Sequence, residues 1–347
     1  MKKRVSTLSW GIIGTGNIAR TFAKGLKGSK TGKLLGIASR SLASAHSFGE
    51  EFNVPVQYDN YEDLLVDKDI QAVYIALPHP LHAEWAIRTA NAGKHILCEK
   101  PLTMTCFETL ETIEAARRND VFLMEAYMYR CHPQTARLVD LIREKIIGDV
   151  RVIQATFSFH ADFSPSELSL QKQRGGGGIL DVGGYPVSMV RLIAGTALGK
   201  NFVEPTEVYG TAHLGKLSQV DEWAIGCLKF PEGIVAQVAA GTSIVQENVL
   251  RIFGSEGEIY VPSPWVPGGR EPGTTKIFVR KRGKITPETI LTKTKRGLYS
   301  LEADVVAAYL DKRQAPAMTW EDTLGNMKTL DRWRKAVGVF YPADTRQ

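Results

Sequence analysis

The first 126 residues alternate apolar runs of strand length with stretches whose apolar positions recur at helical spacing. The runs include LSWGIIGTG, LLGIAS, AVYIAL, HILCEK and VFLMEAY, and the stretches between them include NIARTFAKGLK, SLASAHSFGEEF, LHAEWAIRTANAG and CFETLETIEAARRN. Continuous apolar strands separated by helices are typical of a parallel sheet that is covered on both faces. The pattern therefore predicts a doubly wound α/β domain over residues 1–126.

From about Arg151 the pattern changes to β-rich segments, several of which alternate apolar and polar residues. VRVIQATFSFHA, DEWAIGCLKF and GIVAQVAAGTS are examples. Such alternation predicts a large, mostly antiparallel sheet with one buried and one open face. Helical spacing returns over about 299–339, and the Pro/Gly-rich stretch 261–275 is expected to be an exposed loop. The predicted fold class is α/β throughout, with a second domain over 127–347.

The composition narrows the class of protein. The chain has 347 residues, 43 Lys and Arg against 37 Asp and Glu, and a net charge of +6. Because the basic residues are scattered, they favour small anionic ligands over a nucleic-acid surface. With no signal peptide and no apolar run of about 18 residues, we expect a cytoplasmic protein without a membrane span. Cys98, Cys106, Cys131 and Cys227 form no CxxC pattern and are expected to be reduced, and the seven histidines indicate no metal site.

A glycine-rich turn ends the first apolar run and opens a helix, in the pattern GxGxxG/A. Gly14 permits the tight turn, Gly16 lets the backbone approach a pyrophosphate, and Ala19 keeps the helix close to the strand. The phosphate would then lie on the helix N-terminus. At the first strand-to-helix junction, this pattern favours dinucleotide binding over an ordinary Gly-rich turn. The expected cofactor contacts are Gly14, Thr15, Gly16, Asn17 and Ile18.

The end of the second apolar run indicates which dinucleotide is preferred. NAD enzymes usually place Asp or Glu there to hold the ribose 2′-hydroxyl, whereas Arg accommodates a 2′-phosphate. This chain has Ser39, Arg40 and Ser41 instead of an acid. The planar guanidinium can pair with a phosphate, and the two hydroxyls can donate hydrogen bonds to it. We therefore expect a preference for NADP(H), with NAD(H) possible; the alternative is that Arg40 is a solvated residue at the helix start.

Two further motifs carry candidate chemistry. HILCEKPLT ends a predicted parallel strand with Glu99 and Lys100, at the sheet edge where ligands bind in such folds. RGGGGILDVGGYPV places Asp181 and Tyr185 four residues apart, on one face of a predicted helix. A carboxylate and a phenol placed in this way could bind a substrate hydroxyl together. Taken alone, each motif also fits a structural role, as a surface lysine or as a linker followed by a helix cap.

Together these motifs resemble the glucose-fructose oxidoreductase, inositol dehydrogenase and rhizopine-catabolism (Gfo/Idh/MocA) family. WGIIGTGNIA, YIALPHPLHAEWAIRTANAGKHILCEKPLT and GGGILDVGGYPV carry the resemblance, in family order and spacing. YIALPHPLH and MYRCHPQ resemble the branch that contains dimeric dihydrodiol dehydrogenase and NADP-linked xylose dehydrogenase. The resemblance implies a Rossmann domain, a C-terminal α/β domain and an active site between them. It also implies a homodimer or homotetramer formed through the open face of the second sheet.

The resemblance assigns roles to single residues. Lys100 matches the catalytic-site lysine, Asp181 the aspartate of the second motif, and Tyr185 a position held by His or Tyr. Lys100 is then expected to stabilise the alkoxide-like oxygen of a substrate. Tyr185 is expected to carry the proton, with its pKa lowered by the neighbouring ammonium. Leu77, Pro78, His79, His82 and Glu99 are expected beside the cofactor, although a structural role for His82 is equally compatible with the sequence.

The resemblance also implies the reaction class. The expected protein is an NAD(P)-dependent oxidoreductase that transfers a hydride between nicotinamide and a secondary alcohol or carbonyl of a sugar, cyclitol or related polyol. The alternatives are a redox-neutral enzyme that recycles tightly bound cofactor on a glycoside, and a non-catalytic dinucleotide-binding sensor. Candidate substrate contacts are Tyr129, Arg130, His132 and His160.

Overall fold

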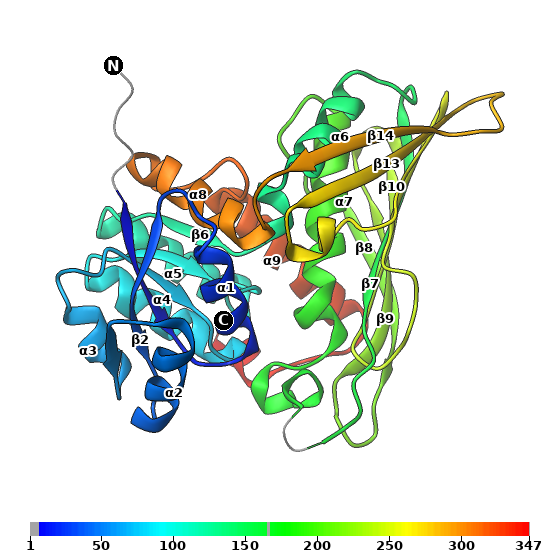
Figure 1. Ribbon diagram of the computed structural model, residues 1–347. Coiled ribbons are helices and arrows are strands. Elements are labelled where there is room, and N and C mark those ends of the chain that lie inside the picture. Colours follow the sequence, from blue (N-terminus) through cyan, green and yellow to red (C-terminus); the bar gives the residue numbers. More distant parts are fainter. Residues whose placement is uncertain (1–6, 165–166, 347) are drawn as a thin grey trace.

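The computed structural model describes residues 7–164 and 167–346, which form two sheet-based halves joined by helices (Figure 1). The first half contains a six-stranded parallel sheet in the order β3-β2-β1-β4-β5-β6. The order reverses between β1 and β4, which places a ligand crevice at the carboxyl ends of these strands. The strands are β1 (Leu8–Ile13), β2 (Gly32–Ala38), β3 (Val56–Tyr58), β4 (Ala72–Ile75), β5 (His95–Cys98) and β6 (Leu123–Glu125).

Helices between these strands cover the parallel sheet and bury their apolar faces against it. Side-chain caps mark three helix starts, because Ser41, Asn60 and Thr105 accept hydrogen bonds from the backbone N–H groups of Ser44, Asp63 and Glu108. The predicted α/β pattern of this half is confirmed, although β3 and α3 were not predicted. The helices are α1 (Asn17–Leu26), α2 (Leu42–Phe52), α3 (Tyr61–Val66), α4 (His82–Asn91) and α5 (Cys106–Arg118).

The second half contains an eight-stranded sheet in the order β14-β13-β12-β11-β7-β10-β9-β8. Its strand pairs are antiparallel apart from β7 and β10, so the prediction of a mostly antiparallel sheet is confirmed. The strands are β7 (Val150–Ser158), β8 (Glu207–Leu214), β9 (Asp221–Lys229), β10 (Val235–Gly241), β11 (Leu250–Gly254), β12 (Gly257–Val261), β13 (Gly273–Lys281) and β14 (Glu288–Thr294).

Helices cover the large sheet on one face and leave the other face open (Figure 1). Helices α6 (Pro133–Arg143) and α7 (Gly184–Ala197) lie on the covered face. Along β9 the exposure alternates: Ala224 and Leu228 are buried, whereas Ile225 is 44% exposed. This alternation is the pattern expected of a sheet with one solvated face.

The C-terminal helices pack against both halves of the molecule. Helix α8 (Leu298–Tyr309) packs on α1, where the Ser300 hydroxyl donates a 2.6 Å hydrogen bond to the Gly25 carbonyl. Helix α9 (Trp320–Ala336) contacts both α5 and α7. These two helices therefore contact both halves of the molecule. Within the part of the chain that the structure describes, no helix is long and apolar enough to cross a membrane.

The expectation of an exposed loop over 261–275 holds only in part: residues 262–263 and 268–272 are exposed, but Pro264, Trp265 and Pro267 are buried. Trp265 is 2% exposed, and its indole N–H donates a 2.7 Å hydrogen bond to the Thr156 carbonyl. The ring also packs against Phe157 and Tyr129. This part of the loop therefore packs on the covered face of the large sheet, because it contains a tryptophan that the sheet buries.

Candidate functional site

The glycine turn between β1 and α1 has the geometry that a dinucleotide phosphate requires. Gly14 has a φ of 103°, and a Cβ atom there would lie 2.3 Å from the Ala76 carbonyl oxygen. Gly16 begins α1 without a side-chain cap, and a Cβ atom there would meet nothing within 4 Å. The first backbone N–H groups of α1 therefore face open space with positive helix-dipole character. These residues fit the pyrophosphate of a dinucleotide.

A cleft runs from this turn along the carboxyl ends of the parallel strands, and we call it the cofactor cleft. Arg40 lies here beside the phenol of Tyr61, and Arg174 approaches from the other half of the chain. Ser41 instead caps α2 and does not line the cleft. The predicted cofactor residues that line the cleft are Gly14, Thr15, Gly16, Asn17, Ile18, Ser39, Arg40, Leu77, Pro78 and His79.

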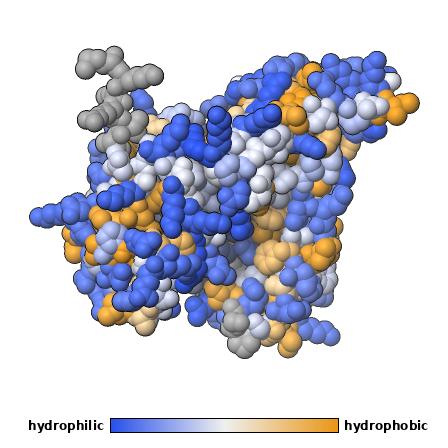
Figure 2. Space-filling view, in the orientation of Figure 1, coloured by the Kyte–Doolittle hydropathy of each residue, from blue (hydrophilic) through white to orange (hydrophobic). Residues whose placement is uncertain are grey.

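A second cavity of about 530 Å³ continues inward from the cofactor cleft, and we call it the inner cavity. Asn17, Ile18 and His79 line both spaces, so a molecule in the cleft would reach the inner cavity. Figure 2 shows the surface hollowed between the two halves, with hydrophilic residues along the hollow. The predicted residues that line the inner cavity are Asn17, Ile18, Leu77, His79, His82, Glu99, Lys100, Asp181 and Tyr185.

Lys100 and Asp181 form an ion pair across the two halves of the molecule. The Lys100 Nζ atom donates to the Asp181 side-chain oxygen at 3.0 Å and to its backbone carbonyl at 2.7 Å. Burial would by itself lower the pKa of Lys100, but Asp181 and Glu99 together raise it. Burial likewise opposes ionisation of Asp181, yet Lys100 and His79 keep its pKa below the usual value. Both groups are therefore charged at neutral pH.

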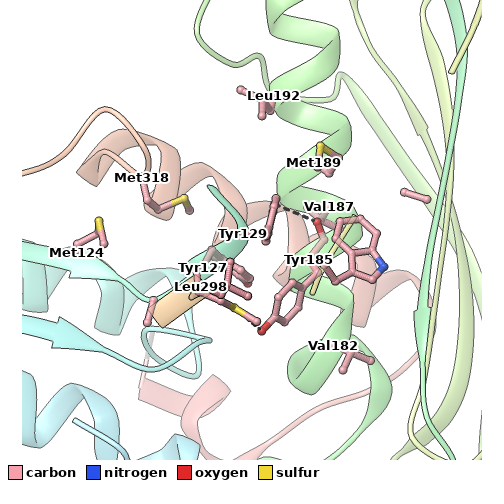
Figure 3. Close-up of a cluster of buried hydrophobic side chains, with 14 of the residues drawn as sticks. Met124, Tyr127, Tyr129, Val182, Tyr185, Val187, Met189, Leu192, Leu298 and Met318 are labelled. Carbon is pink, nitrogen blue, oxygen red and sulfur yellow. Dashed lines mark hydrogen bonds between the residues drawn. The ribbon is translucent and has the colours of Figure 1, made fainter. Parts of the chain in front are cut away.

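Tyr185 lies on the first turn of α7, four residues after Asp181 in the preceding π-helical turn (Ile179–Gly183). The Lys100 Nζ atom lies 5.5 Å from the centre of its ring. Tyr127, Phe157 and other aromatic side chains surround the ring, and its hydroxyl lies 3.5 Å from the sulfur of Met128 (Figure 3). The three proposed catalytic side chains therefore line one cavity.

The expected effect of Lys100 on the phenol is wrong for this arrangement. Burial raises the pKa of Tyr185 well above 10, and the carboxylates of Glu99 and Asp181 raise it further. Lys100 pairs with Asp181, so its charge does not offset the effect of burial on the pKa of Tyr185. Tyr185 is therefore a protonated phenol at neutral pH, suited to donate a proton.

Buried polar groups form hydrogen bonds around the end of β5, which Lys100 follows. The Glu99 side chain accepts a hydrogen bond from the Tyr74 hydroxyl, and burial raises its pKa. His82 is fully buried, with its ring nitrogens 2.7 Å from the carbonyl oxygens of Leu77 and Pro101. Burial lowers the pKa of His82 to about 4, whereas the two carbonyl oxygens act in the opposite direction because each accepts a hydrogen bond from a protonated ring nitrogen. These contacts tie the two strand-end loops together and agree with a structural role for His82.

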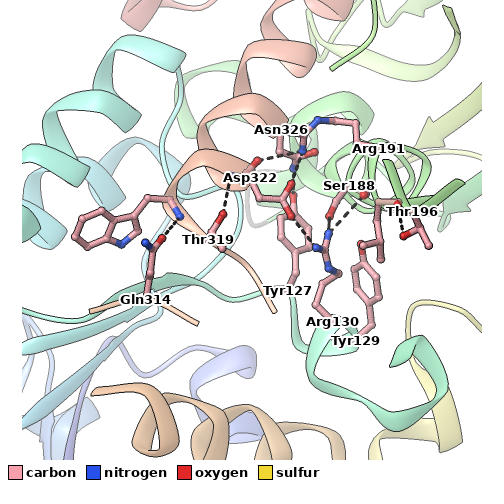
Figure 4. A network of polar contacts seen from close by, with 12 residues as sticks. Tyr127, Tyr129, Arg130, Ser188, Arg191, Thr196, Gln314, Thr319, Asp322 and Asn326 are labelled. Carbon is pink, nitrogen blue, oxygen red and sulfur yellow. Dashed lines mark hydrogen bonds and ion pairs between the residues drawn. The ribbon is translucent and has the colours of Figure 1, made fainter. Parts of the chain in front are cut away.

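The candidate substrate contacts Tyr129, Arg130, His132 and His160 do not line the inner cavity. Arg130 pairs with the buried carboxylate of Asp322 at 2.6 Å, within the polar network of Figure 4. His132 caps α6 by accepting from the Gln134 N–H, and Tyr129 is fully buried. His160 is exposed beside Asp162. These side chains take part in local packing, ion pairs and a helix cap. The structure therefore argues against their direct contact with substrate.

Other residues line the inner cavity although they were not predicted as site residues. Phe157 lies in β7 and Phe159 directly follows this strand, whereas Val266 and the exposed Arg270 lie in the loop between β12 and β13. The alternation of β7 was the one signal that could have placed Phe157 on the covered face. The others depend on the packing of a loop and of α8. Thr21, Met128, Val182 and Tyr299 complete this group.

Family models match both halves of the chain. "Oxidoreductase family, NAD-binding Rossmann fold" matches residues 8–127, and "GFO/IDH/MocA C-terminal domain" matches residues 135–260. The chain belongs to the Gfo/Idh/MocA oxidoreductase family. The resemblance seen in the motifs is thereby confirmed, and this Gfo/Idh/MocA protein is an oxidoreductase with an NAD-binding Rossmann domain.

Relatives of this Gfo/Idh/MocA protein include two named dehydrogenases. Trans-1,2-dihydrobenzene-1,2-diol dehydrogenase of Mus musculus is 30% identical, over 98% of this chain and 99% of that protein. D-xylose 1-dehydrogenase (NADP(+)) 2 of Haloferax volcanii is also 30% identical, over 93% and 95%. A solved 3-ketoreductase from Actinomadura kijaniata, in complex with NADP and TDP-benzene, is 26% identical with a TM-score of 0.85, over 97% of this chain and 99% of that chain.

Proposed function

We propose that the protein is an NADP-preferring oxidoreductase that acts on a CH–OH group or the corresponding carbonyl of a sugar, cyclitol or related polyol. The observation that carries this proposal is the Lys100–Asp181 ion pair, which lies beside Tyr185 in a cavity continuous with the cofactor cleft. Membership of the Gfo/Idh/MocA family supports the reaction class. The names of the relatives, a diol dehydrogenase and a xylose dehydrogenase, support the substrate class.

Lys100 is proposed to bind and polarise the substrate oxygen. A lysine ammonium has three N–H donors, and Asp181 accepts from this one at two oxygens. One donor is thus left for a substrate oxygen, whose developing negative charge the ammonium would stabilise. Asp181 would fix the direction of that donor. Bound NADPH would supply the hydride for reduction of a carbonyl, and NADP⁺ would accept it in the reverse reaction.

Tyr185 is proposed to exchange the proton. In reduction, its hydroxyl would give a proton to the substrate oxygen that Lys100 holds, and solvent would restore that proton. In oxidation, the phenol must first lose its proton to act as a base. Because burial raises the pKa of Tyr185, we expect oxidation of an alcohol to accelerate as the pH rises into the alkaline range, whereas reduction needs no prior deprotonation.

Arg40 supports the proposed preference for NADP(H). It lines the cofactor cleft with Ser39 and Tyr61, at the end of β2 where an acid would select NAD. The relative from Haloferax volcanii and the solved 3-ketoreductase are both named with NADP. NAD(H) is proposed as a weaker cofactor.

A homodimer or homotetramer is proposed to form through the open face of the large sheet. Tyr209, Ile225 and Val235 on this sheet are each more than 40% exposed, and an open apolar surface of this kind favours association. A cytoplasmic location is proposed with it. The free state of Cys98, Cys106, Cys131 and Cys227 is compatible with a reducing compartment.

The test is the change in NADPH absorbance on incubation with aldoses, ketoses, anhydrosugars, inositols and aryl diols, repeated with NADH. The proposal expects net oxidation or formation of NADPH with at least one compound class, and a higher kcat/KM with NADPH than with NADH. Product formation without net cofactor consumption, from cofactor that copurifies, would identify the redox-neutral alternative. Cofactor binding with no conversion of any compound would favour the sensor.

A further inference from the structure

A third cavity, of about 540 Å³, opens beside the inner cavity, between the C-terminal end of α1, the loop before β13 and the start of α8. Thr21, Arg270 and Tyr299 line both this space and the inner cavity, so the two adjoin. Figure 1 shows α1 and α8 near each other at this side of the molecule. We call it the basic cavity because its lining includes Lys24, Lys27, Arg270, Lys295 and Arg296.

Carboxylates neutralise only part of this positive charge. Lys24 pairs with Glu271 at 3.3 Å, and Arg296 pairs with Asp304. Across residues 7–164 and 167–346, no ion pair joins Lys27, Arg270 or Lys295 to a carboxylate. These three side chains are exposed, and the Lys27 Nζ atom lies 5.4 Å from the centre of the Phe52 ring. Cations without carboxylate partners around a concave space attract anions more strongly than cations scattered on a convex surface.

The basic cavity is separate from the expected position of the cofactor phosphates. Those phosphates belong at Gly16, where α1 begins, whereas Lys24 lies in the last turn of the same helix. An α-helix rises about 1.5 Å per residue, so the two ends lie about 12 Å apart along the axis. The unpaired cations are therefore not explained by the pyrophosphate of a dinucleotide.

The backbone at the junction of the two cavities is unusual. Arg270 has a φ of 78°, a left-handed conformation that non-glycine residues rarely adopt, and it follows Gly268 and Gly269 with similar angles. Such conformations persist where the surrounding structure fixes them, often beside ligands. Here the conformation belongs to the arginine that lines both cavities.

We propose that the substrate is a phosphate ester of a sugar or polyol, whose phosphate binds in the basic cavity while the reacting carbon lies beside Lys100. This inference rests on the proposed function. A neutral sugar would make no use of the unpaired ammonium and guanidinium groups, whereas a phosphate forms charge-assisted hydrogen bonds with them. Sugar monophosphates and nucleoside diphosphate sugars share this chemistry.

The first experiment measures binding of inorganic pyrophosphate, by calorimetry, to protein saturated with NADPH so that the cofactor cleft is filled. The double variant Lys27→Ala/Lys295→Ala should bind pyrophosphate at least about tenfold more weakly than the wild type. Lys276→Ala removes the same kind of charge from an exposed position on β13, and should bind pyrophosphate like the wild type. Equal affinity of the wild type and the double variant, or no binding at all, would overturn the inference.

The second experiment compares kcat/KM for parent sugars, their monophosphates and their nucleoside diphosphate esters. The inference expects one phosphate class to exceed the parent sugars at least about tenfold, and this ratio to fall in Lys27→Ala/Lys295→Ala but not in Lys276→Ala. The class with the higher ratio identifies the source of the phosphate. Turnover of neutral sugars alone would refute the inference and leave the proposed function intact. No turnover of any compound, despite pyrophosphate binding, would refute both.

Discussion

Replacing Asp221 by asparagine should remove a large part of the pH dependence of stability. Asp221 begins β9 and is fully buried. One side-chain oxygen accepts a 2.6 Å hydrogen bond from the Ile179 N–H, just before the proposed catalytic residue Asp181. The other oxygen has no hydrogen-bond partner among the residues that the structure describes, and it lies against Gly177, where a Cβ atom would approach it to 2.3 Å. The carboxyl group thus anchors the glycine run beneath the site.

The magnitude follows from the pKa of this carboxyl group. Burial raises the pKa of Asp221 from 3.8 to about 7, because the hydrogen bond from Ile179 compensates only in part. The folded state therefore binds a proton more tightly than the unfolded state. Stability from this group is complete below the unfolded pKa and is lost as the pH rises through about 7. The difference between the two pKa values corresponds to about 4 kcal/mol of unfolding free energy.

The assay is urea unfolding of the wild type and Asp221→Asn between about pH 4 and about pH 8. The unfolding free energy of the wild type should fall relative to that of the variant over this range, because His82 and His132, whose pKa values burial lowers to about 4, act in the opposite direction but equally in both proteins. The variant, whose amide cannot ionise, should lose about 4 kcal/mol less. Glu125, with a burial-raised pKa of about 7, acts in the same direction in both proteins and so cancels in the comparison. Parallel pH curves for the two proteins would refute the reasoning.

Three further changes probe the cofactor cleft and the scaffold. Arg40→Ala should lower kcat/KM with NADPH about tenfold or more and leave kcat/KM with NADH nearly unchanged, because it removes a phosphate partner; an equal loss with both cofactors would contradict this assignment. Gly16→Ala should keep the thermal midpoint of unfolding, since its Cβ atom meets nothing within 4 Å, but should weaken NADPH binding in a fluorescence titration. Unchanged NADPH binding would contradict the proposed pyrophosphate position. Asp322→Ala should cost about 3–5 kcal/mol in urea unfolding, because it leaves the buried guanidinium groups of Arg130 and Arg191 without this shared partner (Figure 4). A loss below about 1 kcal/mol would show that the pairs in this network contribute no more than exposed ones.

Local patterns in the sequence predicted the parts of the site that sit at strand ends. The turn at Gly14 and Gly16 follows β1, and Lys100 follows β5, so both lie at the carboxyl edge of the parallel sheet. The helical spacing of Asp181 and Tyr185 placed them on one wall of a cavity. Each of these predictions needed only a short segment and a general rule about sheets or helices.

The parts that could not be predicted depend on contacts between distant segments. Trp265 is in a Pro/Gly-rich stretch that is typical of exposed loops, but the large sheet buries its ring. Arg130 and His132 lie close in sequence to a predicted strand end, yet an ion pair and a helix cap fix them elsewhere. The pKa of Tyr185 also could not be inferred, because it depends on burial and on which partner Lys100 selects.

Single-turnover kinetics tests most directly the claim that Lys100 and Tyr185 act together on a substrate oxygen in the inner cavity. Wild type, Lys100→Met and Tyr185→Phe would each be loaded with NADPH and mixed with the substrate identified by the compound screen. We expect both variants to bind NADPH within about twofold of the wild type and to oxidise it at least about 100-fold more slowly. NADPH oxidation at near wild-type rates in both variants would contradict the account.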